Sequence, residues 1–258
     1  MLHSLAEPHR DLFERERSFI FLVSHMRSFS SLLGHLLAAC DEVDGYSELH
    51  QSYRTELDLL RMAIDVRGTY DEPLAGTRLF DKLLHRRPVL EPAICNRSDV
   101  HVILAVRTPA DTLASLIRLG SQDSSVSWAA NPDRALLYYQ RRIGDLAALA
   151  SQIDSAAFMV ANELVRDNAA IRSQLASFLD LPAIPATYPL HARTGHKQFG
   201  DTSANIISGT IQPAPSTADD AAIPPAVLEQ ANQAFSDLLA DPALSQLTLI
   251  GDLSRYRV

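Results

Sequence analysis

The sequence predicts an α/β protein with a central parallel β-sheet that carries helices on both faces. Two continuous apolar runs rich in β-forming residues, at 19–23 and 100–106, are typical of strands buried on both sides. Each run leads through a polar turn into apolar residues at helical spacing. This alternation favours a parallel sheet, because parallel strands need long crossover connections. The 258 residues suffice for one such domain, and we predict a single domain over 1–258.

The first half of the chain continues this alternation. After the first strand, the residues at helical spacing are Leu32, Leu33, Leu36, Leu37 and Cys40. The stretch 45–66 begins irregularly and is predicted to become a helix near Gln51, and 77–84 is predicted to be a short strand. After the strand 100–106, Thr108 suits a helix N-cap, Pro109 the first helical position and Gly120 the helix end.

The second half repeats the pattern and ends differently. We predict a long helix from about Pro132, a strand over 156–161 and a helix over 168–181 that ends before Pro182. Residues 209–225 are rich in proline, alanine and small polar residues without periodicity, which predicts an extended surface loop. Residues 226–258 are predicted to be a helical C-terminal segment, and the charged residues 1–17 an N-terminal extension.

Charge and composition narrow the classes of function. The net charge of −8 argues against a general nucleic-acid-binding protein, which is normally basic. The N-terminal residues are too charged for a secretion signal, and no apolar run is long enough to span a bilayer. The only two cysteines fit a reduced protein. We therefore expect a cytoplasmic protein; the sequence does not indicate an oligomeric state.

Two strand–loop–helix turns, at 19–40 and 100–120, carry groups that suit anions. Ligands of open parallel sheets bind beyond the carboxyl ends of the strands, where amides at the helix starts favour negative charge. The first turn adds Arg27 and several serines, and the second adds Arg107 with Ser115 eight residues later. Taken alone, the serines also suit helix capping, and Arg107 suits an ion pair with Asp111.

These motifs resemble a known family. "FLVSHMRSFSSLL" resembles the 5′-phosphosulfate loop of sulfotransferases that use 3′-phosphoadenosine 5′-phosphosulfate (PAPS), and "VILAVRTPADTLASLIRLG" resembles their 3′-phosphate motif. "MVANELVRDNAAIRSQLASFLDLP" is similar to a later strand, acidic turn and helix of the family, and "RTGHKQFGDTS" to its late basic loop. The resemblance covers roughly residues 19–205 and implies the P-loop NTPase-like fold of these sulfotransferases. It departs at Phe29, where that loop usually has glycine.

The resemblance implies a cofactor site and a mechanism. The cofactor would be PAPS, the product adenosine 3′,5′-bisphosphate, and no metal would be required. The implied cofactor-binding residues are Arg27, Ser28, Phe29, Ser30, Ser31, Arg107, Ser115, Arg193, His196 and Lys197. Trp128, Tyr138 and Tyr139 are candidates for contact with the adenine.

Sulfuryl transfer also needs cations at the breaking bond and a base for the acceptor's proton. The resemblance implies Arg27 and Lys82 as the cations. It implies Glu48 as the base, with His50 as the second choice. The acceptor would be a hydroxyl, with an amine as the second choice, on a molecule that the sequence does not identify.

Two other hypotheses remain open at the level of sequence. A divergent P-loop kinase or nucleotide hydrolase would need a magnesium ligand and usually the lysine of GxxxxGK[ST], and the sequence shows neither. A non-catalytic nucleotide-binding protein of the same fold is the other hypothesis, and Phe29 is the residue that supports it.

Overall fold

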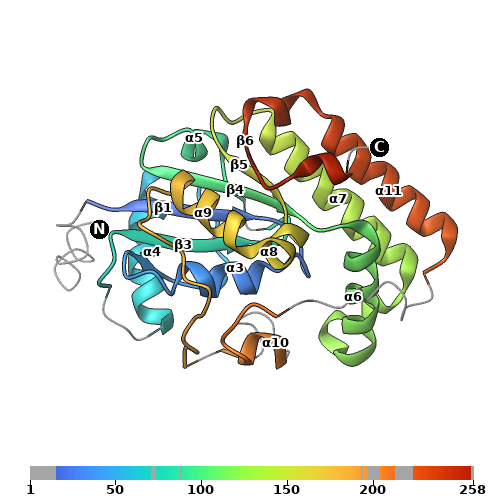
Figure 1. The fold of residues 1–258 in the computed structure, drawn as a ribbon, viewed down its shortest axis with the longest axis horizontal. Coiled ribbons are helices and arrows are strands. Elements are labelled where there is room, and N and C mark those ends of the chain that lie inside the picture. Colours follow the sequence, from blue (N-terminus) through green and yellow to red (C-terminus); the bar gives the residue numbers. More distant parts are fainter. Residues whose placement is uncertain are drawn as a thin grey trace.

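The computed structural model describes residues 16–70, 74–87, 89–192, 194–196, 204–212 and 223–256. These form one six-stranded sheet with the strand order β2-β3-β1-β4-β5-β6, and every neighbouring pair is parallel. The strands are β1 (Ser18–Val23), β2 (Val43–Asp44), β3 (Arg78–Leu83), β4 (Val100–Val106), β5 (Ala157–Val160) and β6 (Thr248–Ile250). The parallel sheet predicted from the apolar runs is confirmed (Figure 1).

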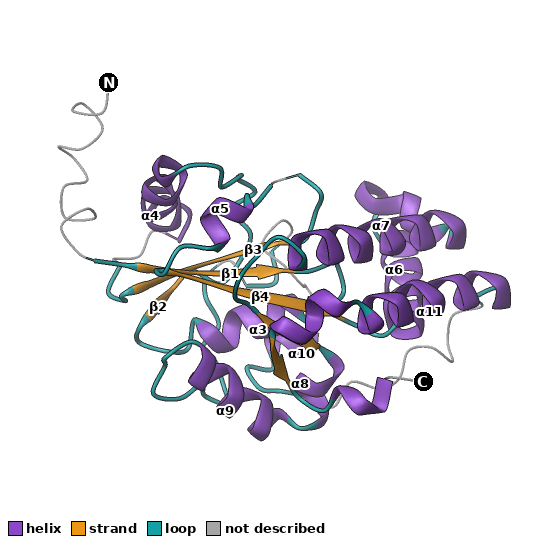
Figure 2. Cartoon of the chain, turned by 90° about the horizontal axis from the view of Figure 1, so that it is seen from above, coloured by secondary structure: helices purple, strands orange, loops and turns teal. Residues whose placement is uncertain are grey.

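Helices cover both faces of this sheet, as predicted (Figure 2). One face carries α4 (Glu56–Tyr70), α5 (Pro92–Cys95), α6 (Pro109–Gln122), α7 (Pro132–Ala150) and α11 (Pro225–Ala240). The other face carries α3 (Ser30–Leu37), α8 (Asn162–Arg166) and α9 (Asn168–Phe178), with the short α10 (Ala204–Ile207) beside them. Alternate residues of β1 enter the two cores, since Phe21 packs into the first and Leu22 into the second.

Three helix boundaries differ from the prediction, and the helix expected over 168–181 ends at Phe178. The helix expected from about Gln51 begins at Glu56, because the backbone of Tyr53 bonds to Val89 and Glu91 and so keeps this stretch extended. The helix that begins at Pro109 continues past Gly120. A Cβ at this glycine would collide with the backbone of residues 129–130, so Gly120 allows a close approach of two segments instead of ending the helix.

The two edge strands of the sheet, β2 and β6, were not predicted. The strands β2 and β6 have only two and three residues, too few to show a periodic pattern. The helical C-terminal segment predicted over 226–258 is therefore wrong in part, because β6 follows α11 and a 3-10 turn.

Residues 1–15 of the predicted extension and 213–222 of the predicted loop lie outside the described residues. Nowhere in the described part is a helix both long and apolar enough to cross a membrane.

Candidate functional site

The candidate site lies at the carboxyl edge of the sheet, around the end of β1. This strand has β3 on one side and β4 on the other. The chain leaves β1 toward α3 on one face and leaves β4 toward α6 on the opposite face. Strand order therefore reverses at β1, and such a switch point leaves a crevice where open α/β sheets bind ligands.

The loop from Ser24 to Phe29 is held by its own serines. Ser24 Oγ lies 2.6 Å from both Ser28 Oγ and the carbonyl oxygen of Ala105 on β4. The Ser28 hydroxyl donates to the His25 carbonyl at 2.7 Å. The N-cap residue of α3 is Phe29, which forms no side-chain capping hydrogen bond, so none of these serines occupies the cap position. Ser30 and Ser31 begin α3, whose first amides lack acceptors within the helix and suit an anion.

Phe29 adopts a backbone conformation that glycine normally occupies. Its φ of 60° and ψ of 18° are left-handed, and Arg27 has a φ of 66°. A side chain in this region costs about 1–2 kcal/mol. The loop thus keeps the backbone path that a glycine would give. The Phe29 ring packs against the core on the α3 side of the sheet. The Arg107 guanidinium lies over this ring, with 4.3 Å between Cζ and the ring centroid.

We expect Phe29→Ala to be less stable than Phe29→Gly. Both variants lose the ring, but only alanine retains a Cβ in the left-handed conformation. The difference in free energy of unfolding should be about 1 kcal/mol in favour of glycine. Urea unfolding of the two variants measures it, and an alanine variant as stable as the glycine variant would show that residue 29 is not left-handed in solution.

The two strand–loop–helix turns predicted to bind anions, at 19–40 and 100–120, contact each other; we call them the two anion loops. Arg27 Nε donates to Ser115 Oγ at 2.9 Å, and Arg107 Nη1 donates to the Arg27 carbonyl at 3.1 Å. Arg107 is 5% exposed and Ser115 8% exposed. The expected pair of Arg107 with Asp111 is present but long, at 3.9 Å. Two arginines that lie eighty positions apart in the chain thus place their guanidinium groups beside the start of α3.

Helix α7 holds this loop from the other face of the sheet. The Tyr138 hydroxyl accepts from the Met26 amide at 2.7 Å and donates to the Leu84 carbonyl at 3.0 Å. The Tyr139 hydroxyl donates to the Arg107 carbonyl, and the Arg142 guanidinium donates to the Ser24 carbonyl. Tyr138 therefore supports the loop after β1 through part-buried contacts, and Tyr139 supports the end of β4 through a buried one, roles that the sequence did not indicate. Trp128, the other candidate for adenine contact, packs against the Tyr138 ring.

Lys82 brings a third cation to the same edge. It is the penultimate residue of β3, is 1% exposed, and donates through Nζ to Ser31 Oγ at 3.2 Å. Its charge contributes to the lowered pKa values of His35 and His85, after the larger effect of their burial. The predicted cation from β3 therefore lies against the first turn of α3.

Glu48 lies between two histidines near this edge. Its Oε2 is 3.8 Å from His50 Nδ1 and 3.7 Å from His85 Nε2. The Glu48 side chain is 10% exposed, whereas that of His50 is 52% exposed. Burial lowers the pKa of His85, and the Glu48 charge opposes this shift. His85 was not among the predicted site residues, although its place directly after a predicted strand end was a usable signal.

The segment that carries Glu48 is anchored to a buried acid on β3. Asp81 is fully buried and accepts from the Leu49 amide at 2.9 Å and from the Tyr53 hydroxyl at 2.7 Å. Burial raises the pKa of Asp81 to about 7, and the Glu48 charge adds to this shift against the lowering effect of the hydrogen bonds. The sequence analysis did not select Asp81, because an isolated acid within a strand gives no sign of burial.

The raised pKa of Asp81 gives a prediction on pH and stability. The folded-state pKa of Asp81 exceeds the unfolded value, so the folded protein is favoured by the protonated carboxyl. This contribution to the free energy of unfolding is complete below about pH 4 and is lost as the pH rises through about 7. The variant Asp81→Asn cannot ionise there. We therefore expect its free energy of unfolding, relative to the unmodified protein, to increase by a few kcal/mol between about pH 4 and about pH 8. Urea unfolding across this range tests it; curves that stay parallel would contradict the raised pKa.

The late basic loop is only partly described. Arg193 and Lys197 lie outside the described residues, and His196 is exposed. The neighbouring Thr194 accepts from the His191 amide at 3.0 Å and lies 2.9 Å from His35 Nε2. His35 Nδ1 in turn lies 2.8 Å from the Ser31 carbonyl oxygen. Sequence analysis missed His35, which links this loop to the first turn of α3.

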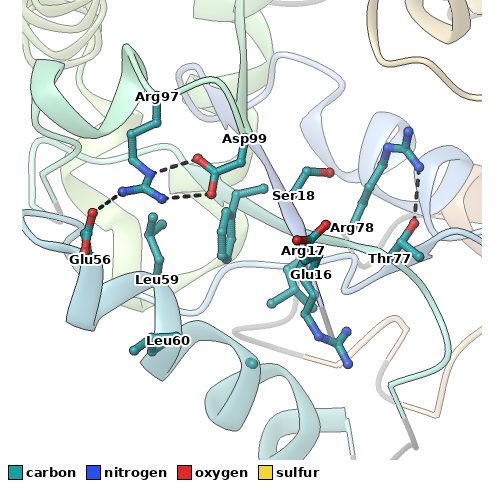
Figure 3. A pocket seen from close by; sticks show the side chains of 13 residues that line it. Glu16, Arg17, Ser18, Glu56, Leu59, Leu60, Thr77, Arg78, Arg97 and Asp99 are labelled. Atoms are coloured by element: carbon teal, nitrogen blue, oxygen red, sulfur yellow. Dashed lines mark hydrogen bonds and ion pairs between the residues drawn. The ribbon is translucent and has the colours of Figure 1, made fainter. Parts of the chain in front are cut away.

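A cavity of about 730 Å³ lies at the opposite, amino edge of the sheet. Figure 3 shows two of its arginines already engaged: Arg97 donates to both Glu56 and Asp99, and Arg78 donates to Thr77. Of the predicted site residues that the structure describes, none lines this cavity. The candidate site is therefore the carboxyl edge of the sheet, where open parallel sheets generally bind ligands beside the starts of helices. Within the described ranges, no group of three or more His, Cys, Asp or Glu side chains is placed to hold a metal ion.

Comparison with solved structures bears on this architecture. The sulfotransferase domain from the curacin biosynthetic pathway superposes with a TM-score of 0.56 and 19% identity, covering 85% of this chain and 98% of that domain. The chain has the sulfotransferase fold. A second sulfotransferase-fold structure, the sulfotransferase domain from the Synechococcus PCC 7002 olefin synthase, has a TM-score of 0.51 and 20% identity, covering 85% of this chain and 95% of that domain.

Two comparisons at the level of sequence found no match. No family model matches the chain, and no curated protein sequence matches it. The prediction of a sulfotransferase fold from the two loop motifs is therefore confirmed by the arrangement of the backbone, at an identity of 19–20%.

Proposed function

We propose that this protein is a PAPS-dependent sulfotransferase that transfers the sulfuryl group to a hydroxyl of an acceptor. The observation that carries the proposal is the meeting of the two anion loops, with Arg27 Nε 2.9 Å from Ser115 Oγ and Arg107 on the Arg27 carbonyl. One ligand with two anionic groups fits two such loops. The sulfotransferase fold supports the same activity, because the similar domains are named sulfotransferases.

The residues at the carboxyl edge fit this cofactor. Arg27, Lys82 and the first turn of α3 would surround the 5′-phosphosulfate, since Lys82 Nζ already lies 3.2 Å from Ser31 Oγ. Arg107 and Ser115 would hold the 3′-phosphate, where the planar guanidinium can form two parallel hydrogen bonds. These cations gather locally on a protein with a net charge of −8, which favours a specific anion site over general attraction.

The chain's own groups also fit an in-line displacement. Bound PAPS would supply the sulfuryl group, whose bond to the phosphate oxygen breaks as the acceptor oxygen bonds to sulfur. Arg27 and Lys82 stabilise the negative charge that develops on that leaving oxygen. Glu48 accepts the proton of the acceptor hydroxyl, and its 10% exposure keeps the carboxylate largely out of bulk water. His50 remains the second candidate for the base.

A pair of labelled donors tests the proposed reaction against its alternatives. The protein is incubated with a panel of alcohols, phenols and amines, once with sulfur-labelled PAPS and once with γ-phosphate-labelled ATP and magnesium. We expect label to move from PAPS to a hydroxyl compound and none to move from ATP. Transfer from ATP would instead establish a kinase. Binding of adenosine 3′,5′-bisphosphate without any transfer across the panel would favour the non-catalytic binding protein.

A further inference from the structure

We propose that His25 is a positioning residue that sets the distance between the two anion loops, and thereby selects ligands with two phosphate groups. The inference rests on the proposed function and adds a determinant of cofactor specificity to it. His25 is fully buried between the end of β1 and the end of β4. It lies two residues before Arg27, and its ring reaches across the sheet to Arg107.

The hydrogen bonds of His25 join the backbones of both loops. The Arg107 amide donates to His25 Nε2 at 3.0 Å, so this nitrogen carries a lone pair. The other ring nitrogen, Nδ1, therefore carries the proton and donates to the Met26 carbonyl at 2.8 Å. The ring is thus neutral, with one defined tautomer. Its two hydrogen bonds connect Met26 in the first loop to Arg107, which lies 82 positions after His25 in the sequence.

The surroundings keep the ring neutral and fixed. The pKa of His25 is lowered to about 3, mainly by burial; the hydrogen bond to Met26 opposes this shift, and the charges of Arg142 and Arg107 contribute to it. Tyr139 packs edge-on to the ring, with 5.3 Å between centroids, and its hydroxyl donates to the Arg107 carbonyl. Both the amide and the carbonyl of Arg107 are therefore tied down, one by the first loop and one by α7.

A fixed distance matters only for a ligand that uses both loops. Such a ligand gains from its second contact when the loops are already spaced to match it. A nucleotide with a single 5′-phosphate contacts only the first loop and gains nothing from this spacing. Loosening the His25 bond should therefore lower the affinity for adenosine 3′,5′-bisphosphate and leave that for adenosine 5′-monophosphate almost unchanged.

Two substitutions of His25 form a matched pair for the test. In His25→Asn the amide ends near the position of Nδ1, so it can reach Met26 but not Arg107. In His25→Gln the longer side chain places an oxygen near the position of Nε2 and restores an acceptor for the Arg107 amide. Titration calorimetry with adenosine 3′,5′-bisphosphate and adenosine 5′-monophosphate gives the ratio of the two dissociation constants for each protein.

We expect the dissociation constant of adenosine 5′-monophosphate divided by that of adenosine 3′,5′-bisphosphate to fall about tenfold in His25→Asn. The same ratio should recover in His25→Gln. A purely structural role would weaken both nucleotides together and leave the ratio unchanged, which would overturn the inference. Absence of bisphosphate binding in the unmodified protein would instead refute the proposed function. Should His25→Asn fail to fold, nitrogen NMR of the unmodified protein decides: a proton on Nε2 in place of Nδ1 would rule out the bond to Arg107.

Discussion

Replacement of Arg107 by alanine is expected to weaken the binding of adenosine 3′,5′-bisphosphate about a hundredfold or more. Arg107 is only 5% exposed, so a phosphate held by its guanidinium would be largely screened from water by the surrounding protein. Each hydrogen bond to a charged group contributes about 1.5–3 kcal/mol, and a bidentate pair would approach twice that. Calorimetric titration of the variant measures the loss.

Arg107→Lys is the matched control for this prediction. Lysine keeps the charge but loses the forked geometry, so its affinity should fall between those of the alanine variant and the unmodified protein. Since Arg107 also donates to the Arg27 carbonyl and packs on Phe29, thermal unfolding must first show that both variants are folded. Unchanged affinity in a folded alanine variant would remove Arg107 and its loop from the cofactor site.

Replacement of Glu48 by glutamine is expected to abolish most turnover and leave cofactor affinity intact. Glutamine has nearly the same shape but cannot accept the proton of an acceptor hydroxyl at neutral pH. General-base catalysis typically contributes about 10²–10⁴-fold, which sets the expected loss. Turnover is followed as release of adenosine 3′,5′-bisphosphate from PAPS in the presence of an active acceptor, with nucleotide affinity measured in parallel.

His50→Gln provides the comparison that distinguishes the two candidate bases. Both side chains lie on the same segment, and His50 Nδ1 is 3.8 Å from Glu48 Oε2. If Glu48 is the base, the His50 variant should lose only a small part of its turnover. The exposed His50 ring would then affect the reaction only through its electrostatic interaction with Glu48. The opposite ranking of the two variants would assign the base to His50.

Much of the fold could be predicted because its central strands are strongly apolar. The strands β1 and β4 are buried on both faces, so their sequences read as continuous apolar runs. The spacing of Arg107 and Ser115 likewise follows from a strand end and a helix that begins with proline. The resemblance placed Phe29 where the phosphosulfate loop of the family usually has glycine, but the left-handed backbone of this residue was not predicted.

The contacts that hold the site together could not be predicted. The pattern of α7 shows which of its faces is apolar, but not that Tyr138, Tyr139 and Arg142 bond to the ends of three strands. Asp81 is buried because Tyr53 and the Leu49 amide fold over it, which is a long-range event. Such partners depend on tertiary packing, and local periodicity carries no information about them.

The most direct test of this account is calorimetric titration of the unmodified protein with adenosine 3′,5′-bisphosphate, with ATP and magnesium as the comparison. The two joined anion loops predict tight binding of the bisphosphate without magnesium and no comparable binding of ATP. A protein that ignores the bisphosphate, or prefers ATP with magnesium, would contradict the proposed cofactor and leave only the sulfotransferase fold established.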